Sequence, residues 1–144
     1  MLIHRCSAPD VDLVLRAGYL FEYPPQQSLV REFLSRPGHH LLIAMDGDMP
    51  VGFVSGIEVC HPDKRVEMLL YELSVAETHR RRGIGRGLVE ELLALAADIG
   101  CRGMWVPLDS DNEAAIATYR SARADETETS LIMSWDLEAP AGRR

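Results

Sequence analysis

The chain has 144 residues, 47% of them hydrophobic and 26% charged, and its formal net charge at pH 7 is −7. This length suits one domain with a hydrophobic core, so we expect residues 1–138 to form a single domain and residues 139–144 a flexible tail. The acidic balance argues against a nucleic-acid partner bound through its phosphate backbone. No apolar run approaches the roughly 18 residues of a membrane span, and no secretory signal is apparent. These features favour a cytoplasmic protein with no membrane partner.

The pattern of apolar residues alternates between short strands and amphipathic helices along the chain. Pro24-Pro25 breaks the first helix, and Asp111 or Asn112 caps the last one. The expected elements, in chain order, are a strand at 2–5, a helix that Asp10 caps and that carries Leu20, a short helix at 27–35, strands at 40–45, 51–60 and 67–75, a helix at 84–99, a strand at 101–108, a helix that ends near residue 122 and a strand at 130–137.

The strand, helix and strand of residues 67–108 form a crossover unit, so their two strands should be parallel neighbours. The earlier strands follow tight turns and should be antiparallel. The predicted fold class is therefore α/β, with a mixed, mostly antiparallel sheet and helices on both faces. Within residues 67–75, alternation predicts four side chains on one face of the sheet. These four are Met68, Leu70, Glu72 and Ser74.

Three cysteines, Cys6, Cys60 and Cys101, are widely spaced along the chain. Their odd number does not indicate a disulfide framework, and each lies in an apolar run, so we expect buried free thiols. No Cys or His spacing is typical of a zinc site, and we therefore expect no metal.

The segment from Arg80 to Gly87 carries the strongest functional signal, because it is basic, rich in glycine and lies between a strand and a helix. Free backbone N–H groups at a helix start attract anions. Glycines let a phosphate approach the backbone, and arginines supply charge. The segment therefore predicts a pyrophosphate cradle. It lacks the Gly-Lys-Ser/Thr of a Walker loop and the third glycine of a dinucleotide fingerprint, where Leu88 stands. A solvated basic turn is the alternative.

The motif Arg80-x-x-Gly83-x-Gly85 resembles the Gln/Arg-x-x-Gly-x-Gly/Ala motif of the GCN5-related N-acetyltransferases (GNAT). The resemblance extends upstream to Tyr71–Val75 and downstream to Asn112-x-x-Ala115-x-x-x-Tyr119, over roughly residues 40 to 122. It implies that acetyl-CoA is the co-substrate and that the two parallel strands splay to form a cleft for its thioester. The implied cofactor-binding residues are Leu73, Ser74, Val75, Arg80, Arg81, Arg82, Gly83, Ile84, Gly85, Arg86, Gly87, Asn112 and Ala115.

Two side chains are candidates for the chemistry. By resemblance, Tyr119 faces the departing sulfur and protonates it as a general acid. Alternatively, Tyr119 only packs its helix on the sheet. Glu72 is the candidate base, because an ammonium group must lose a proton before it attacks a thioester. Glu72 could instead be an ordinary edge carboxylate or a substrate anchor.

Within the superfamily, the chain is most similar to the aminoglycoside 3-N-acetyltransferases, through Tyr71–Val75, His79–Ile84 and Ala115–Tyr119. Glu72 replaces that branch's Asp, and Ala122-Arg123 replaces its Leu-Gly. The predicted partner is a small cationic amine, attacked directly, and Tyr23 is expected to help select it. Acidic residues in predicted loops or element ends could line its site. These are Glu22, Asp109, Asp111, Asp125, Glu126 and Glu128.

Two other functions stay open at this point. One is a protein or peptide N-acetyltransferase, and the other is a non-catalytic module that binds acetyl-CoA. A homodimer also stays open.

Overall fold

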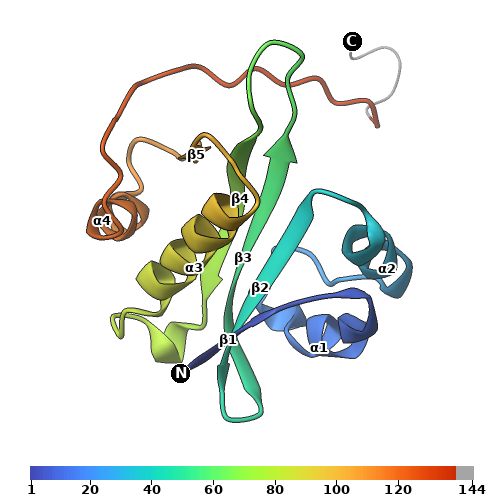
Figure 1. Ribbon diagram of the computed structural model, residues 1–144. Helices are drawn as coiled ribbons and strands as arrows, with labels where there is room; N and C mark the ends of the chain where they lie inside the picture. The colour runs from blue at the N-terminus through green and yellow to red at the C-terminus, as the bar shows by residue number, and fades with distance from the viewer. Residues whose placement is uncertain (139–144) are drawn as a thin grey trace.

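The computed structural model describes residues 1–138, so the predicted tail at 139–144 lies outside the described residues. One sheet organises the fold, with its strands in the order β1-β2-β3-β4-β5 (Figure 1). The first four strands are antiparallel neighbours, and β4 and β5 are parallel, as predicted. The strands are β1 (Leu2–Arg5), β2 (His39–Asp46), β3 (Met49–Val59), β4 (Glu67–Val75) and β5 (Met104–Trp105).

Helices cover both faces of this sheet. The long helix α3 packs across β2, β3 and β4 on one face and carries α4 beside it, whereas α1 and α2 lie on the other face (Figure 1). The helices are α1 (Val11–Arg16), α2 (Gln27–Ser35), α3 (Ile84–Asp98) and α4 (Glu113–Ser121), with short 3-10 turns at Ala8–Asp10, Gly18–Leu20 and Glu77–His79. None of the described helices has the length and apolar character needed to cross a membrane.

The structure corrects four expectations. The first helix is not continuous but divides into α1 and two 3-10 turns. The strand predicted at 101–108 is reduced to the two residues of β5, because its pairing with β4 stops there and Pro107 has no N–H to donate. The strand predicted at 130–137 is absent, because that segment has no neighbouring strand, and β5 is therefore the sheet edge. Cys60 is exposed rather than buried, and Cys6 and Cys101 are partly buried.

A β-bulge in β4 overturns the predicted alternation of its side chains. Ser55 of β3 pairs with Glu72 whereas its neighbour Gly56 pairs with Leu70, which leaves Tyr71 as an extra residue. Because residues paired across a ladder share a face and neighbours on β3 alternate, Leu70 and Glu72 lie on opposite faces. Glu72 and Ser74 therefore point toward the α1–α2 side, not toward the side of α3 with Leu70.

Gly56 allows α3 to lie close to the sheet beside this bulge. A methyl group at Gly56 would be 2.8 Å from both Leu92 Cδ1 and Met68 Sδ, which is an overlap with fully buried neighbours. We expect Gly56→Ala to destabilise the fold by about 1–3 kcal/mol, the usual cost of overpacking a core. Gly103→Ala is the matched control, because no atom lies within 4 Å of its added methyl group. Urea unfolding measures both, and equal midpoints for the two variants would contradict the close packing.

Candidate active site

The turn between β4 and α3 forms an open helix start. Gly83 is the N-cap residue, has a φ of 80° and offers no capping side chain, and Arg81 also has a positive φ of 62°. Gly83 O accepts the first helical hydrogen bond from Gly87 N–H at 2.9 Å. The amides of Ile84, Gly85 and Arg86 consequently have no acceptor within the helix. This geometry suits an anion at the end of the helix.

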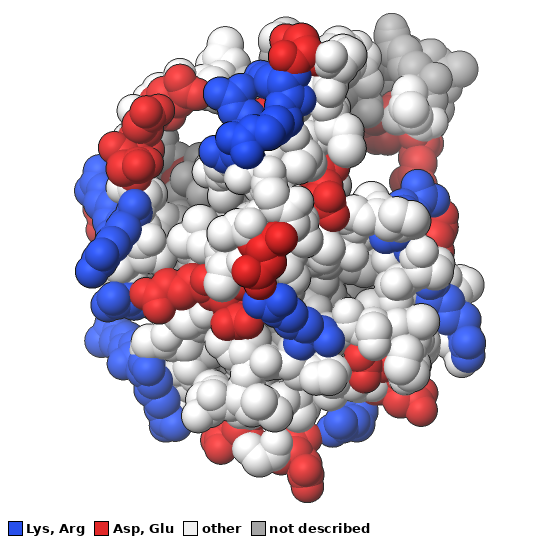
Figure 2. Space-filling view, viewed as in Figure 1, with Lys and Arg blue, Asp and Glu red and all other residues white. Residues whose placement is uncertain are grey.

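Arginines surround this helix start. Arg80, Arg81 and Arg82 are exposed, and Arg80 Nε donates to the carbonyl of Val75 at 3.3 Å, which ties the turn to the end of β4. Arg86 pairs with Glu90 one helical turn away at 2.6 Å. Basic side chains gather at the lower left of the molecule, near this turn (Figure 2). Phosphates would therefore meet both free amides and positive charge here.

β4 and β5 diverge next to the turn, as predicted. Their ladder contains the pairs Met68–Met104 and Leu69–Trp105, and no described strand lies opposite Leu70–Val75 on that side. Backbone groups along this part of β4 are thus available on one edge. An extended, amide-containing chain could bind there as an added strand does.

Three elements meet at Gly85. A methyl group placed there would lie 3.3 Å from Thr118 Cγ2 and 3.8 Å from Val75 Cγ2, so the α3 start contacts both α4 and the end of β4. The predicted residues of these three segments therefore surround one place in the fold. Asn112 has a defined local role in this arrangement, because its side-chain oxygen accepts from Ala115 N–H at 3.1 Å and caps α4.

Tyr119 lies on α4, half-buried, and packs against the hydrophobic core. Desolvation by burial raises the pKa of its phenol above the usual value near 10. The hydroxyl therefore remains protonated at neutral pH, as a proton donor must. Packing on the core also agrees with the alternative that Tyr119 only anchors its helix.

Glu72 lines a cavity of about 280 Å³ with Phe21, Glu22, Tyr23 and Tyr71. The bulge forms the β4 side of this cavity, because it turns the adjacent residues Tyr71 and Glu72 toward the segment that follows α1. The backbone N–H of Glu72 donates to the hydroxyl of buried Ser55 at 3.1 Å, which holds the bulge. The alternation of apolar and polar residues gives no signal for Phe21, for Ser55 or for this role of Tyr71.

Burial raises the pKa of the Glu72 carboxyl, and the negative charge of Glu22 raises it further. Both effects disfavour the ionised form. Of the six acidic residues predicted to line the acceptor site, Glu22 lines this cavity. The other five are exposed elsewhere in the described chain, and they are Asp109, Asp111, Asp125, Glu126 and Glu128.

Glu22 should therefore control the pH dependence of any proton transfer to Glu72. A base works only when ionised, so kcat/KM should fall as the pH drops through the raised pKa of Glu72. Glu22→Gln removes the repulsion, lowers that pKa and should shift the acidic limb of the profile to lower pH. Asp109→Gln is the control, because Asp109 does not line the cavity. If the pH profiles of kcat/KM had the same acidic limb in both variants, the charge of Glu22 would not affect the pKa of Glu72.

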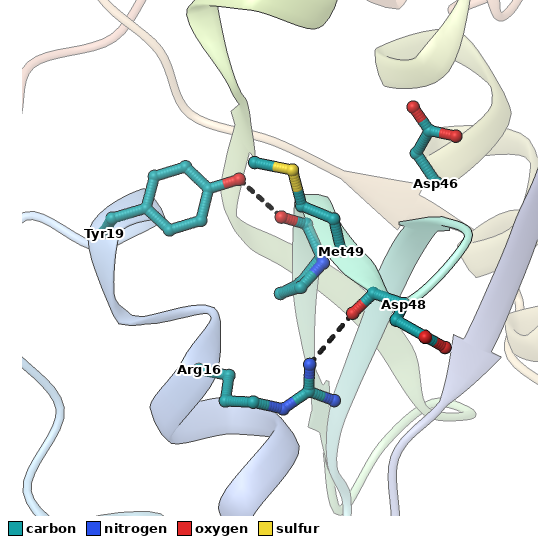
Figure 3. Close-up of a pocket in the computed structure, with 6 residues that line it drawn as sticks. Arg16, Tyr19, Asp46, Asp48 and Met49 are labelled. Atoms are coloured by element: carbon teal, nitrogen blue, oxygen red, sulfur yellow. Dashed lines mark hydrogen bonds between the residues drawn. The ribbon is translucent and has the colours of Figure 1, made fainter.

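A second, larger cavity of about 570 Å³ lies at the start of β3 and contains none of the predicted site residues (Figure 3). Its polar groups are bound to one another: Arg16 donates to the carbonyl of Asp48 at 2.9 Å, and the Tyr19 hydroxyl donates to the carbonyl of Pro50. Asp46, at its rim, pairs with buried His79 at 2.9 Å. The first two contacts connect α1 and the 3-10 turn after it to the β2–β3 hairpin, and the third connects the hairpin to the 3-10 turn that follows β4.

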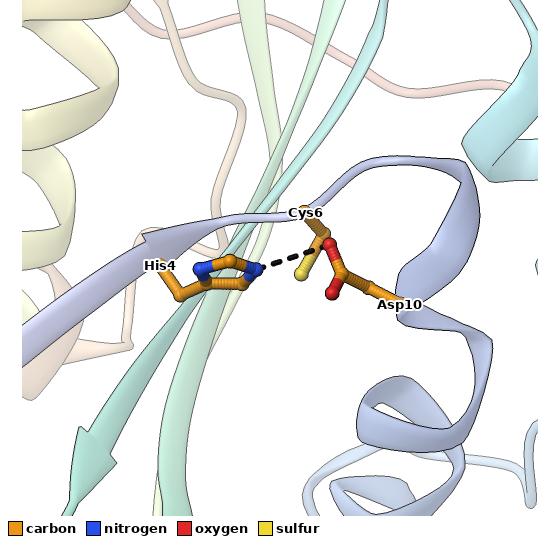
Figure 4. Close-up of side chains that lie close together, drawn as sticks. All are labelled: His4, Cys6 and Asp10. Atoms are coloured by element: carbon orange, nitrogen blue, oxygen red, sulfur yellow. Dashed lines mark hydrogen bonds and ion pairs between the residues drawn. The ribbon is translucent and has the colours of Figure 1, made fainter.

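His4, Cys6 and Asp10 form the cluster with metal-ligand chemistry among residues 1–138 (Figure 4). The Asp10 carboxylate already accepts from Ser7 N–H at 2.7 Å and contacts His4 Nε2 at 3.0 Å. Burial, with a smaller contribution from Asp10, raises the pKa of the Cys6 thiol to about 12. The thiol is thus neutral, and the contacts fix the turn after β1. That the protein needs no metal stays a prediction.

Comparison with known proteins decides the family. The sequence profile of the acetyltransferase (GNAT) family matches residues 10–123, which include the turn, β4 and α4. The chain belongs to the GNAT family. Human N-acetyltransferase 8 is 30% identical to this GNAT protein over 108 residues, which are 74% of the chain and 48% of that relative. The chain thus spans about half the length of the curated relatives it matches.

Solved structures agree on the GNAT fold. The aminoglycoside acetyltransferase meta-AAC0020, from an uncultured soil metagenomic sample, superposes with a TM-score of 0.89 at 19% identity, covering 95% of this chain and 96% of that one. The aminoglycoside N-acetyltransferase AAC(6')-Iy in complex with CoA gives a TM-score of 0.78 at 19% identity, covering 93% of each chain. At these identities the likeness establishes the fold: a mixed sheet with a splayed parallel pair.

Proposed function

We propose that this GNAT protein transfers the acetyl group of acetyl-CoA to a primary amine of a small cationic acceptor. One observation carries the proposal: the uncapped start of α3, the unpaired edge of β4 and α4 meet at Gly85. The free amides and arginines of the turn would hold the pyrophosphate, and the edge of β4 would hold the pantetheine arm. The complex of AAC(6')-Iy with CoA supports the same co-substrate.

In the proposed reaction, Glu72 accepts a proton from the acceptor's ammonium group, directly or through one water. The free amine attacks the thioester carbonyl directly, the carbon–sulfur bond breaks, and Tyr119 gives its phenolic proton to the departing sulfur. The extra proton on the newly acylated nitrogen then passes through water to the Tyr119 phenolate, which restores the phenol. The pKa directions suit these roles, since the raised pKa makes Glu72 a stronger base than a carboxylate of ordinary pKa and Tyr119 stays protonated. An amide donor near Val75 would stabilise the developing oxyanion. Holding the reactants together supplies much of the rate.

The acceptor class follows from the cavity beside Glu72. Two carboxylates, Glu22 and Glu72, face a space that is also lined by the aromatic rings of Tyr23 and Tyr71. Carboxylates attract an ammonium group, and aromatic rings can bind cations over their faces. An aminoglycoside is one acceptor with this chemistry, and structural neighbours that bear that name support it. The acetylated position, at the 3-amine or the 6'-amine, is determined by NMR spectroscopy of the product.

The test measures CoA release from acetyl-CoA with aminoglycosides, polyamines, amino acids and peptides as acceptors. The proposal expects turnover with one of the small polycations and with little else. Activity on peptides alone would favour a protein or peptide N-acetyltransferase. Saturable binding of acetyl-CoA without turnover on any acceptor, unchanged by Glu72→Gln and Tyr119→Phe, would favour a non-catalytic binding module.

A further inference from the structure

A buried histidine directly precedes the segment that predicts the pyrophosphate cradle. His79 is 9% exposed, and Ser55 is the other buried polar residue among residues 1–138. His79 ends the 3-10 turn Glu77–His79, so its neighbour in the chain is Arg80, the first residue of the cradle. Burial of a polar side chain is unfavourable unless the side chain is hydrogen-bonded. The partners of His79 therefore indicate what its burial achieves.

Both ring nitrogens of His79 have a partner. Nε2 lies 2.9 Å from Oδ2 of Asp46, the last residue of β2, and Nδ1 lies 2.8 Å from the hydroxyl of Thr78. An ionised carboxylate can only accept, so Nε2 carries the hydrogen of the first bond. The carboxylate of Asp46 points away from Arg16 (Figure 3) and pairs with His79 instead. The imidazole thus holds the chain after β4 against the β2–β3 hairpin.

The turn that follows His79 has a backbone conformation that needs such support. Arg81 has a φ of 62°, in the left-handed region that is unfavourable for residues with a Cβ. Conformations of this kind persist where the surrounding structure holds them. Arg80 Nε donates to the carbonyl of Val75 at 3.3 Å, but the Arg80 side chain is exposed, whereas the bond to Asp46 is made by a buried ring. His79 is therefore the buried attachment of the turn to the β2–β3 hairpin.

We propose that His79 is a positioning residue for the diphosphate of acetyl-CoA. Through its bond to Asp46, it holds the turn in the conformation that leaves the first amides of α3 free for an anion. A site that is ordered before its ligand arrives loses less entropy on binding, and a site that is ordered in only a fraction of the molecules has its apparent affinity reduced by that fraction. This inference rests on the proposed function, because it concerns the acetyl-CoA end of the same site.

Three full-length variants separate the hydrogen bond from the bulk of the ring. His79→Leu keeps an apolar side chain of similar size but loses the bond to Asp46, and it should weaken CoA binding about 5- to 30-fold. His79→Gln keeps an N–H group that can reach the carboxylate, and it should restore the affinity to within about threefold of wild type. His61→Leu is the matched control, because it breaks a histidine–carboxylate contact of 2.8 Å with Glu67, at the opposite end of β4. Calorimetric titration with CoA measures the dissociation constants, and in steady-state kinetics the KM for acetyl-CoA should rise in His79→Leu while kcat changes little.

Trypsin digestion tests the turn without any cofactor. Trypsin cleaves after Lys and Arg, and residues 80–82 of the turn are three exposed arginines. Cleavage of a folded chain requires local opening and follows the population of the open form. His79→Leu should therefore be cleaved several-fold faster than wild type in the turn. Cleavage after Lys64 and Arg65, which are exposed in the β3–β4 hairpin, should keep its rate.

Weaker CoA binding in His79→Leu but not in His79→Gln, with faster cleavage in the turn alone, supports this role. Wild-type affinity in His79→Leu would overturn it, and so would a His79→Gln variant that binds CoA as weakly as His79→Leu. Faster cleavage at both ends of β4 would mean that His79 supports the whole fold rather than the turn, which would overturn the role as well. A wild-type chain that binds no CoA would overturn the proposed function, and the positioning of the diphosphate with it.

Discussion

Tyr119→Phe is expected to lower kcat by about 10²- to 10⁴-fold, the range that general acid catalysis usually supplies. The departing thiolate must take up a proton to become free CoA, and the half-buried phenol, with its raised pKa, is the proposed donor. The phenylalanine ring keeps the packing of α4 on the core, so the affinity for CoA should change little. Steady-state kinetics with the best acceptor and calorimetric titration with CoA measure the two quantities separately.

Tyr19→Phe is the matched control for this substitution. It removes the same hydroxyl from a residue whose partner is the carbonyl of Pro50 in the cavity at the start of β3, and that cavity contains none of the predicted site residues. It should therefore leave kcat close to the wild-type value. A Tyr119→Phe enzyme with wild-type kcat would mean that Tyr119 only packs its helix on the sheet. Glu72→Gln, tested alongside, should depress kcat/KM most strongly at the pH optimum, where the wild-type carboxylate is ionised.

The sequence predicts the parts of this fold that depend on local spacing. The apolar stripe of residues 84–99 predicts α3 to within one residue, because helical periodicity over four turns is a strong signal. Asn112 was one of two expected caps for the last helix, and the structure selects it. The sequence also predicts a glycine-containing turn between β4 and α3, and the structure places Gly83 of this turn at the N-cap of α3; that the turn binds a pyrophosphate stays a prediction. These features need no knowledge of distant partners.

What the sequence does not reveal depends on pairing between distant strands. The bulge at Tyr71 is one extra residue relative to β3, and nothing in the alternation of 67–75 marks it. Its effect is large, because it reverses the face on which Glu72 lies and places that carboxyl beside Glu22. Residues 130–137 show the opposite case: their strand pattern is clear, but a strand forms only where an edge is within reach.

Arg86→Pro is expected to weaken CoA binding about 10- to 100-fold by removing one backbone N–H from the cradle. A hydrogen bond to a charged group contributes about 1.5–3 kcal/mol, and each 1.4 kcal/mol is roughly tenfold in affinity. Proline is tolerated in the first turn of a helix. The preceding Gly85 has no Cβ to clash with the proline ring.

Arg86→Ala isolates the amide from the side chain, since it loses the same exposed guanidinium and its pair with Glu90 but keeps the N–H. Exposed pairs contribute little, so most of the loss in Arg86→Pro should be absent from Arg86→Ala. Calorimetric titration gives both dissociation constants, and thermal unfolding verifies that each variant is folded. Equal affinities in two folded variants would mean that charge, rather than the main chain, holds the diphosphate. The Arg86 amide would then have no part in binding, which would contradict its place in the proposed cradle.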